Sequence, residues 1–303
     1  MERHVQFTNH GLTLYGALHL SPEAAPQRDV GLLFLHGWAG YRIGPHQMFT
    51  KMARRAAAAG FASLRFDFRG RGDSEGDPLA ASLATMISDA QAAARVLREE
   101  AGVGRICLVG DCSGGEVAFG AGVKIAEADS MVLWSVPLIA ADRAVTDRAK
   151  RRDIWRRYGA KLFRRESWSK LVGGRLNWGL IRKAIAGGGK GAGEDTSESP
   201  PEDQQIDWWE RVVGFRGGVL YVYGGNDPTT PECLAHYERL SRVAGRAFEH
   251  HIVAGANHAF YSLAWEQEVM DTSLHWLQHR YRATFRPGAA LASRSATPSI
   301  AAS

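Results

Sequence analysis

The residues of this chain best suited to covalent chemistry lie in the hexapeptide Gly-Asp-Cys-Ser-Gly-Gly at positions 110–115. It follows an apolar run over 106–109 and precedes small residues whose pattern predicts a helix over 113–126. A strand, a sharp turn flanked by glycines and a helix lift the central side chain above the end of a sheet. Cys112 is therefore the candidate nucleophile, because a thiolate is intrinsically nucleophilic and a helix N-terminus stabilises its charge.

Two other interpretations of the hexapeptide remain open. Ser113 could be the nucleophile, but the residue two positions before it would then be Asp111, whose side chain would crowd the turn. Alternatively, the segment is a glycine-rich turn that carries a buried thiol and no chemistry, since short motifs recur by chance.

A cysteine nucleophile needs a base, and the base needs an acid that orients it. Asp227 and His258 each follow a predicted strand in the second half of the chain. The carboxyl ends of parallel strands gather at one edge of a sheet, so both side chains are expected beside Cys112. Taken singly, Asp227 could be a turn residue before a proline and His258 a loop residue. Asp142 is the alternative acid.

The same edge of the sheet should carry an oxyanion hole, a pair of N–H groups that stabilise a negatively charged oxygen. The amide of Ser113, at the start of the predicted helix, supplies one donor. The other is expected from the loop His-Gly-Trp-Ala-Gly at 36–40, where glycines let the backbone approach a carbonyl oxygen. The N–H of Trp38 is the best-placed donor there. The alternative is a tight strand-to-helix turn without this role.

Strands alternate with helices along the chain, which predicts an α/β fold with a mostly parallel sheet flanked by helices. An antiparallel hairpin is expected first, over 5–7 and 12–19. The remaining predicted strands cover 30–35, 62–68, 105–109, 131–136, 218–223 and 248–253. The predicted helices cover 48–59, 83–100, 113–126, 232–243 and 266–281.

Together these segments resemble the α/β-hydrolase superfamily, in which nucleophile, acid and histidine follow one another in this order. The loop at 36–40 and the segment Asp-Phe-Arg-Gly-Arg-Gly-Asp-Ser-Glu-Gly at 67–76 are similar to those of serine-aminopeptidase-like hydrolases and of hydrolases associated with bacterial exosortase loci. The resemblance implies a structural role for 67–76. The elbow resembles that of dienelactone hydrolases, which also use a Cys–Asp–His triad. Serine relatives have Ser where Cys112 stands, and dienelactone hydrolases lack so large an insertion as 138–207.

The alternation of strands and helices breaks after Pro137, and this break sets the expected domain organisation. A hydrolase core is expected over 1–137 and 208–283, with a helical cap over 138–207 where caps of that superfamily lie. Within the cap, residues 187–205 have low complexity and are expected to form a mobile linker. The tail at 284–303 is expected to be disordered.

The predicted cap is strongly basic. From Arg143 to Lys183 there are fourteen Lys or Arg residues against three Asp or Glu, a net charge of +11, whereas the whole chain carries +5. Trp155 and Trp168 are expected to roof the active site, and arginines such as Arg156 to attract an anionic substrate. The alternative is a solvated helical face, neutralised by the acidic stretch at 194–207.

Composition limits the other function classes. Because the basic residues are concentrated in one segment, no general nucleic-acid-binding surface is expected. No apolar run approaches the roughly 20 residues of a membrane-spanning helix, and the start of the chain lacks the apolar stretch of a signal peptide. Three cysteines argue against a disulfide framework, so a reducing, cytoplasmic location is expected. No cofactor or metal is expected.

The leading prediction is a hydrolase that cleaves a carboxylic ester or thioester through an acyl-enzyme on Cys112. An acyltransferase on the same triad is a variant, because an acyl-cysteine can pass its acyl group to another acceptor. The alternative from a different class is a catalytically silent scaffold whose basic cap binds a partner or an anionic membrane surface. The presence of both Asp227 and His258 favours the enzyme.

Overall fold

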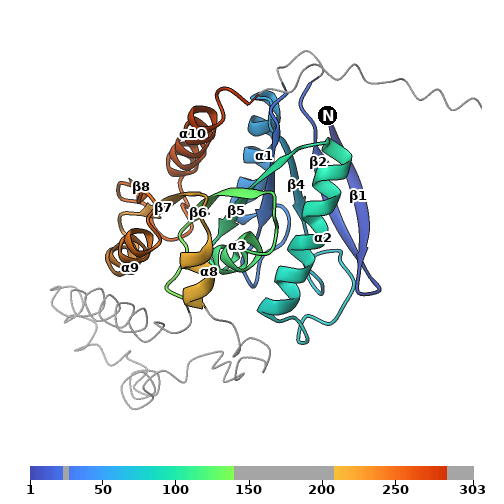
Figure 1. Ribbon diagram of the computed structural model, residues 1–303, viewed down its shortest axis with the longest axis horizontal. Coiled ribbons are helices and arrows are strands. Elements are labelled where there is room, and N and C mark those ends of the chain that lie inside the picture. The colour runs from blue at the N-terminus through green and yellow to red at the C-terminus, as the bar shows by residue number, and fades with distance from the viewer. Residues whose placement is uncertain (23–26, 140–207, 285–303) are drawn as a thin grey trace, which may run out of the picture.

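One eight-stranded sheet forms the centre of the molecule in the computed structural model, which describes residues 1–22, 27–139 and 208–284 (Figure 1). From edge to edge the strand order is β1-β2-β4-β3-β5-β6-β7-β8. The strands are β1 (Glu2–Asn9), β2 (Leu12–His19), β3 (Val30–Leu35), β4 (Ala62–Phe66), β5 (Arg105–Asp111), β6 (Ala128–Trp134), β7 (Gly218–Gly224) and β8 (Glu249–Val253).

Most of the sheet is parallel. β1 pairs antiparallel with β2, and β2 pairs antiparallel with β4, whereas all the other neighbours run parallel. β3 reads Val-Gly-Leu-Leu-Phe-Leu, and every residue of it is buried. Unbroken apolar strands of this kind need both faces of the sheet to be covered. The predicted α/β class with a mostly parallel sheet is confirmed.

Helices cover both faces of the sheet. α1 (Met48–Ala58), which follows the short 3-10 helix η1 (Pro45–Gln47), packs on one face together with α10 (Leu263–Arg280). The opposite face carries α2 (Leu83–Ala101), α3 (Gly114–Gly122), α8 (Trp208–Gly214) and α9 (Thr230–Val243). These two layers bury separate apolar cores on either side of the sheet, and the strands divide them.

Local sequence explains where α2 begins and ends. Ser82 Oγ accepts from the Thr85 N–H at 3.2 Å, and Thr85 Oγ1 accepts from the Ser82 N–H at 2.8 Å, which together form a capping box. Gly102 ends the helix in the left-handed conformation, with φ 59°. Such a conformation is open to glycine at little cost, so the helix stops there.

The predicted elements differ from the observed ones mainly at their ends. The strand predicted over 62–68 ends at Phe66, because the next residue, Asp67, turns its carboxylate to backbone N–H groups of neighbouring loops. The helix predicted over 113–126 is shorter and covers Gly114–Gly122. The sequence pattern does not predict α8, whose seven residues are too few to show a helical period.

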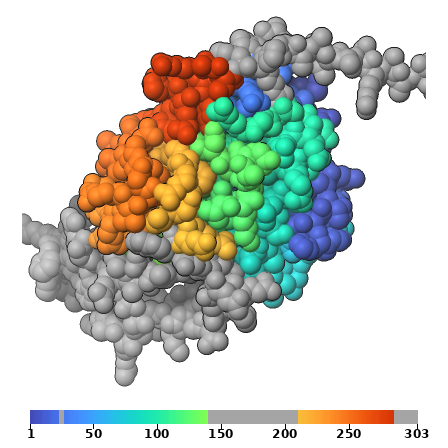
Figure 2. Space-filling model, in the orientation of Figure 1, coloured from blue at the N-terminus to red at the C-terminus, as the bar shows by residue number. Residues whose placement is uncertain are grey.

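The first and last parts of the described chain share one sheet. β6 pairs with β7 across the long insertion, with Met131 opposite Val219. In Figure 2 the green segment lies between the blue-to-teal first half and the orange-to-red last part. The predicted linker and tail, and the predicted cap from residue 140 on, lie outside the described residues. Among the helices that the structure describes, none combines the length and apolar character needed to cross a membrane.

Candidate active site

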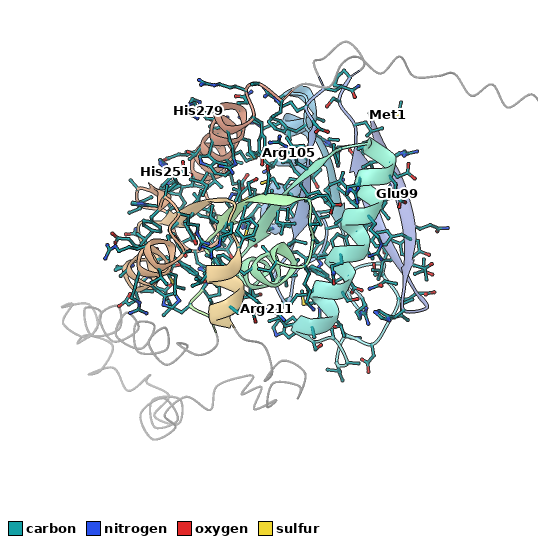
Figure 3. The ribbon with its side chains drawn as sticks, in the orientation of Figure 1. Met1, Glu99, Arg105, Arg211, His251 and His279 are labelled. Atoms are coloured by element: carbon teal, nitrogen blue, oxygen red, sulfur yellow. The ribbon has the colours of Figure 1, made fainter. Side chains whose placement is uncertain are left out.

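The turn after β5 has the conformation that the hexapeptide predicts. Cys112 lies in the left-handed region at φ 51°, which is rare for a residue with a side chain. A Cβ on Gly110 would lie 2.8 Å from the Gly114 carbonyl oxygen, and one on Gly114 would overlap the Leu35 carbonyl. Only glycine fits at these two positions, so the turn can close tightly and hold Cys112 at its tip. Figure 3 labels Arg105 at the opposite, amino, end of β5.

Ser113 lies beyond the tip of this turn. Its φ of −63° and ψ of −13° are helical, and it is the N-cap residue of α3. The N–H groups at the first turn of a helix have no partner within the helix, so the Ser113 amide is available to a ligand. Of the two residues, only Cys112 has the left-handed conformation at the tip of the turn.

Asp227 and His258 meet at the same edge of the sheet. His258 Nδ1 lies 2.6 Å from Asp227 Oδ2, and the other carboxylate oxygen accepts from Thr229 N and Thr229 Oγ1 at 3.0 and 2.8 Å. The Asp227 side chain is 4% exposed and the His258 side chain 45%. Burial acts to raise the pKa of Asp227, but the hydrogen bonds from His258 and Thr229 outweigh it and hold that pKa below its usual value.

The loops that carry the acid and the histidine are fastened to each other. The N–H of Gly225 donates to the Val253 carbonyl at 2.9 Å, and the N–H of Asn226 to the Ala256 carbonyl at 2.7 Å. The Asn226 side chain adds a bond to the Gly255 carbonyl at 3.0 Å. The separation between Asp227 and His258 is therefore set by backbone contacts and not by the two side chains alone.

The charge state of His258 depends on both of its neighbours. Burial acts to lower its pKa, but hydrogen bonds with Asp227 and with the Cys112 side chain outweigh it and raise the pKa of His258 to about 10. The ring is therefore an imidazolium at neutral pH. The hydrogen bond with Asp227 and the interaction with Cys112 both stabilise this positive charge.

This raised pKa predicts a pH-dependent contribution to stability. The folded-state pKa of His258 lies above its ordinary value of 6.5, so the contribution is fully present below about pH 6.5 and is lost as pH rises through about 10. The difference in unfolding free energy between the parent protein and His258→Gln should shrink across that range. Urea unfolding at several pH values measures this difference in unfolding free energy. A difference that does not change with pH would contradict a raised pKa of His258.

A second carboxyl group lies beside Cys112 in the chain. Burial raises the pKa of Asp111 to about 6, while the nearby positive charge of His258 opposes this shift. The carboxyl is thus mostly ionised at neutral pH and protonates just below it. Its charge opposes a negative charge on Cys112, but it also attracts the His258 imidazolium.

The loop after β3 holds the predicted oxyanion donor. The N–H of Trp38 donates to Ser113 Oγ at 2.8 Å, a contact that the sequence does not predict. The loop is anchored by His36, which bonds the Gly37 carbonyl through Nδ1 at 2.8 Å and accepts from the Phe68 N–H through Nε2 at 3.3 Å. Burial lowers the pKa of His36 to about 4, so the ring is neutral.

The segment 67–76 behaves as a structural loop, as the resemblance implies. The Asp67 carboxylate is fully buried and accepts from the N–H groups of Arg42 and Asp73 at 2.6 and 3.1 Å. It also forms an ion pair with the Arg42 guanidinium. These contacts fix the loop and leave the carboxylate no part in the site.

Two residues that sequence reasoning missed position the site. Ser135, which follows β6, has φ 47° and donates through Oγ to the His258 carbonyl at 2.8 Å. Thr229 supplies both of its donors to Asp227. A polar residue directly after a buried strand and a threonine two residues after the acid are signals that could have indicated them.

The other two thiols are less accessible than that of Cys112. Cys107 in β5 and Cys233 in α9 are fully buried, and burial raises the pKa of each to about 12. Cys112 is partly exposed. The predicted substrate-binding residues Trp155, Trp168 and Arg156 and the alternative acid Asp142 lie outside the described residues.

Cys112, Asp227 and His258 follow β5, β7 and β8, which is the chain order of nucleophile, acid and histidine in α/β-hydrolases. A sheet of this topology with that order defines the class of protein. The chain matches the model of the alpha/beta hydrolase family over residues 32–272, so it belongs to this family and is a hydrolase by class.

Solved structures share the fold at low sequence identity. An esterase of Pyrococcus furiosus has a TM-score of 0.62 and 18% identity, with 93% of this chain and 91% of that chain covered. Est1E of Butyrivibrio proteoclasticus, solved with ferulic acid bound, has a TM-score of 0.61 and 15% identity, with 91% of this chain and 98% of that chain covered. A dienelactone hydrolase of Anabaena variabilis has a TM-score of 0.59 and 14% identity, with 94% of this chain and 99% of that chain covered. No curated protein matches the chain.

Proposed function

We propose that the protein hydrolyses a carboxylic ester or thioester with Cys112 as nucleophile, His258 as base and Asp227 as orienting acid. The observation that carries the proposal is the hydrogen bond between His258 and Asp227 at the same edge of the sheet as Cys112, which has the left-handed conformation at the tip of its turn. The esterase and the dienelactone hydrolase among its structural neighbours support an acyl-transfer chemistry.

In the first half of the reaction, the Cys112 thiol has already given its proton to His258, and the sulfur attacks the carbonyl carbon. The carbonyl oxygen becomes an oxyanion, which the N–H groups of Ser113 and Trp38 would stabilise. The tetrahedral intermediate collapses as the bond to the leaving alcohol or thiol breaks, and His258 returns the proton to that leaving group. An acyl-cysteine remains.

In the second half, neutral His258 takes a proton from water, and the resulting hydroxide attacks the acyl-cysteine. The second tetrahedral intermediate releases the carboxylic acid and restores the Cys112 sulfur. Asp227 holds the ring through Nδ1 in both halves and stabilises its positive charge. Esters and thioesters suit this site better than amides, because an amide needs stronger protonation of its leaving group.

The test is turnover of p-nitrophenyl esters and of acyl thioesters of increasing chain length, with and without iodoacetamide. We expect turnover that iodoacetamide abolishes, together with an acyl group on Cys112 detected by mass spectrometry after a rapid acid quench. Product analysis with added alcohols and thiols distinguishes an acyltransferase, which would form a new ester or thioester instead of the free acid. Absence of turnover and of acylation across the series would favour the silent scaffold.

The basic segment predicts a charge preference. Replacing Arg151, Arg152, Arg156 and Arg157 with glutamine should lower the rate for an anionic ester several-fold more than for a neutral ester of equal size. The difference between the rate losses for the anionic and the neutral ester should become smaller with added salt, because exposed charges are screened beyond a Debye length of roughly 8 Å at physiological ionic strength. Steady-state kinetics at two salt concentrations measures both effects.

A control variant removes two positive charges elsewhere. Arg95 of α2 and Arg239 of α9 are exposed, and their replacement by glutamine should leave the ratio of the two rates unchanged. Equal losses for both esters in the cap variant, with no salt dependence, would mean that the arginines form a solvated outer face.

A further inference from the structure

The Ser113 side chain lies at the point where the two proposed oxyanion donors converge. Its hydroxyl accepts a hydrogen bond of 2.8 Å from the N–H of Trp38, although the two residues are 75 positions apart. Trp38 belongs to the loop after β3, and Ser113 directly follows Cys112. The hydroxyl therefore occupies the space between the amide of the loop and the tip of the turn.

The surroundings of this hydroxyl are built to admit it. A Cβ on Gly37 would lie 3.1 Å from Ser113 Oγ and 3.6 Å from Cys112 Cβ. The absence of a side chain at Gly37 thus leaves room for the hydroxyl. A substrate carbonyl bonded to the Cys112 sulfur would place its oxygen in the same small region.

Within the described residues, the Ser113 hydroxyl makes fewer hydrogen bonds than a serine hydroxyl can make. A serine hydroxyl donates one hydrogen bond and accepts two. Ser113 Oγ accepts from Trp38, and within the described part of the chain its own proton has no acceptor. The O–H group can therefore donate to an oxygen of a ligand while it keeps its bond from the Trp38 amide.

We propose that the Ser113 hydroxyl, and not the Trp38 N–H itself, is the second direct donor of the oxyanion hole, and that the Trp38 N–H acts on the oxyanion through this hydroxyl. This inference rests on the proposed function. In the tetrahedral intermediate, Trp38 N–H donates to Ser113 Oγ, and Ser113 O–H donates to the charged oxygen beside the Ser113 amide. The proton stays on Oγ, and no covalent bond to Ser113 forms or breaks. Each bond in such a chain polarises the next, so the accepted bond strengthens the donated one.

The test is the kinetics of Ser113→Ala and Ser113→Thr. Alanine keeps the backbone donor and removes only the hydroxyl, so kcat should fall by roughly 10²-fold with little change in KM, the usual effect of losing one oxyanion donor. Threonine retains the hydroxyl and should recover kcat to within a few-fold of the parent. An aldehyde analogue of the substrate acid, which forms a thiohemiacetal with Cys112, should bind Ser113→Ala more weakly by a similar factor.

A second readout separates this role from a structural one. Alkylation of Cys112 by iodoacetamide forms no oxyanion, so its rate in Ser113→Ala should stay within about twofold of the parent if the turn is intact. If the parent shows no Cys112-dependent turnover, the proposed function itself fails. If the parent is active and Ser113→Ala keeps its kcat, the inference alone fails.

Three more outcomes would overturn the proposal. A higher kcat in Ser113→Ala would mean that the hydroxyl blocks the Trp38 amide and must be displaced by substrate. Slowed alkylation together with no recovery in Ser113→Thr would mean that position 113 acts through the shape of the turn. An acyl group found on Ser113 instead of Cys112 would make the hydroxyl the nucleophile.

Discussion

Replacing Cys112 with alanine is expected to abolish ester hydrolysis, with a loss in kcat on the order of 10⁴-fold or more. The variant keeps the positive φ of the turn and the Asp227–His258 pair but has no sulfur to form the acyl-enzyme. Labelling by a thiol-directed probe should disappear from the native protein at the same time. Hydrolysis of a p-nitrophenyl ester, together with circular dichroism to confirm the fold, measures the result.

Two variants make this result specific. Cys112→Ser retains a nucleophilic oxygen that His258 can still deprotonate, so some activity should remain. Cys107→Ala removes a buried thiol from β5, the strand that ends just before Cys112, and should hydrolyse the ester at nearly the parent rate. Full activity in Cys112→Ala would exclude the sulfur as nucleophile. The Ser113 hydroxyl would then be the next candidate to test.

The second large effect is expected from Asp227→Asn, which should lower kcat by roughly 10⁴-fold with a much smaller change in KM. The asparagine amide can donate where the carboxylate could only accept, so His258 turns its unprotonated Nδ1 towards it. The ring proton then sits on Nε2, the nitrogen that must receive the proton of Cys112. The histidine also loses the negative charge that raises its pKa.

Thr229→Val is the matched control for this variant. It removes one donor from Asp227 Oδ1 but leaves the carboxylate and its bond to His258 in place. We expect less than a tenfold loss of kcat. If Asp227→Asn is as active as Thr229→Val, another acid must orient the ring, and Asp142 is then the first position to replace.

The sequence predicts the parts of the site that depend on local pattern. The turn around Cys112 is encoded by its own glycines, and the buried strands by unbroken apolar runs, so both can be found without knowing the fold. Asp227 and His258 could be placed beside Cys112 because parallel strands end at one edge of a sheet. The observed bond of 2.6 Å between them agrees with that expectation.

Contacts between distant segments could not be predicted in the same way. The bond from Trp38 to Ser113 Oγ depends on how closely the loop after β3 approaches the turn after β5, which no local pattern specifies. The bond from Ser135 to the His258 carbonyl likewise depends on the packing of the two loops. α8 could not be predicted because its seven residues are too few to show a helical period.

The three thiols differ in accessibility, so their rates of reaction with a thiol reagent can be used to follow unfolding. Cys112 is accessible in the native state, whereas Cys107 and Cys233 lie on opposite sides of the sheet, each in a different apolar core. A native molecule should therefore consume one equivalent of reagent quickly, and the next two only as its cores open. If Cys233 reacts before Cys107, the layer that contains α9 opens first. If Cys107 reacts first, the layer of α1 and α10 opens before the other.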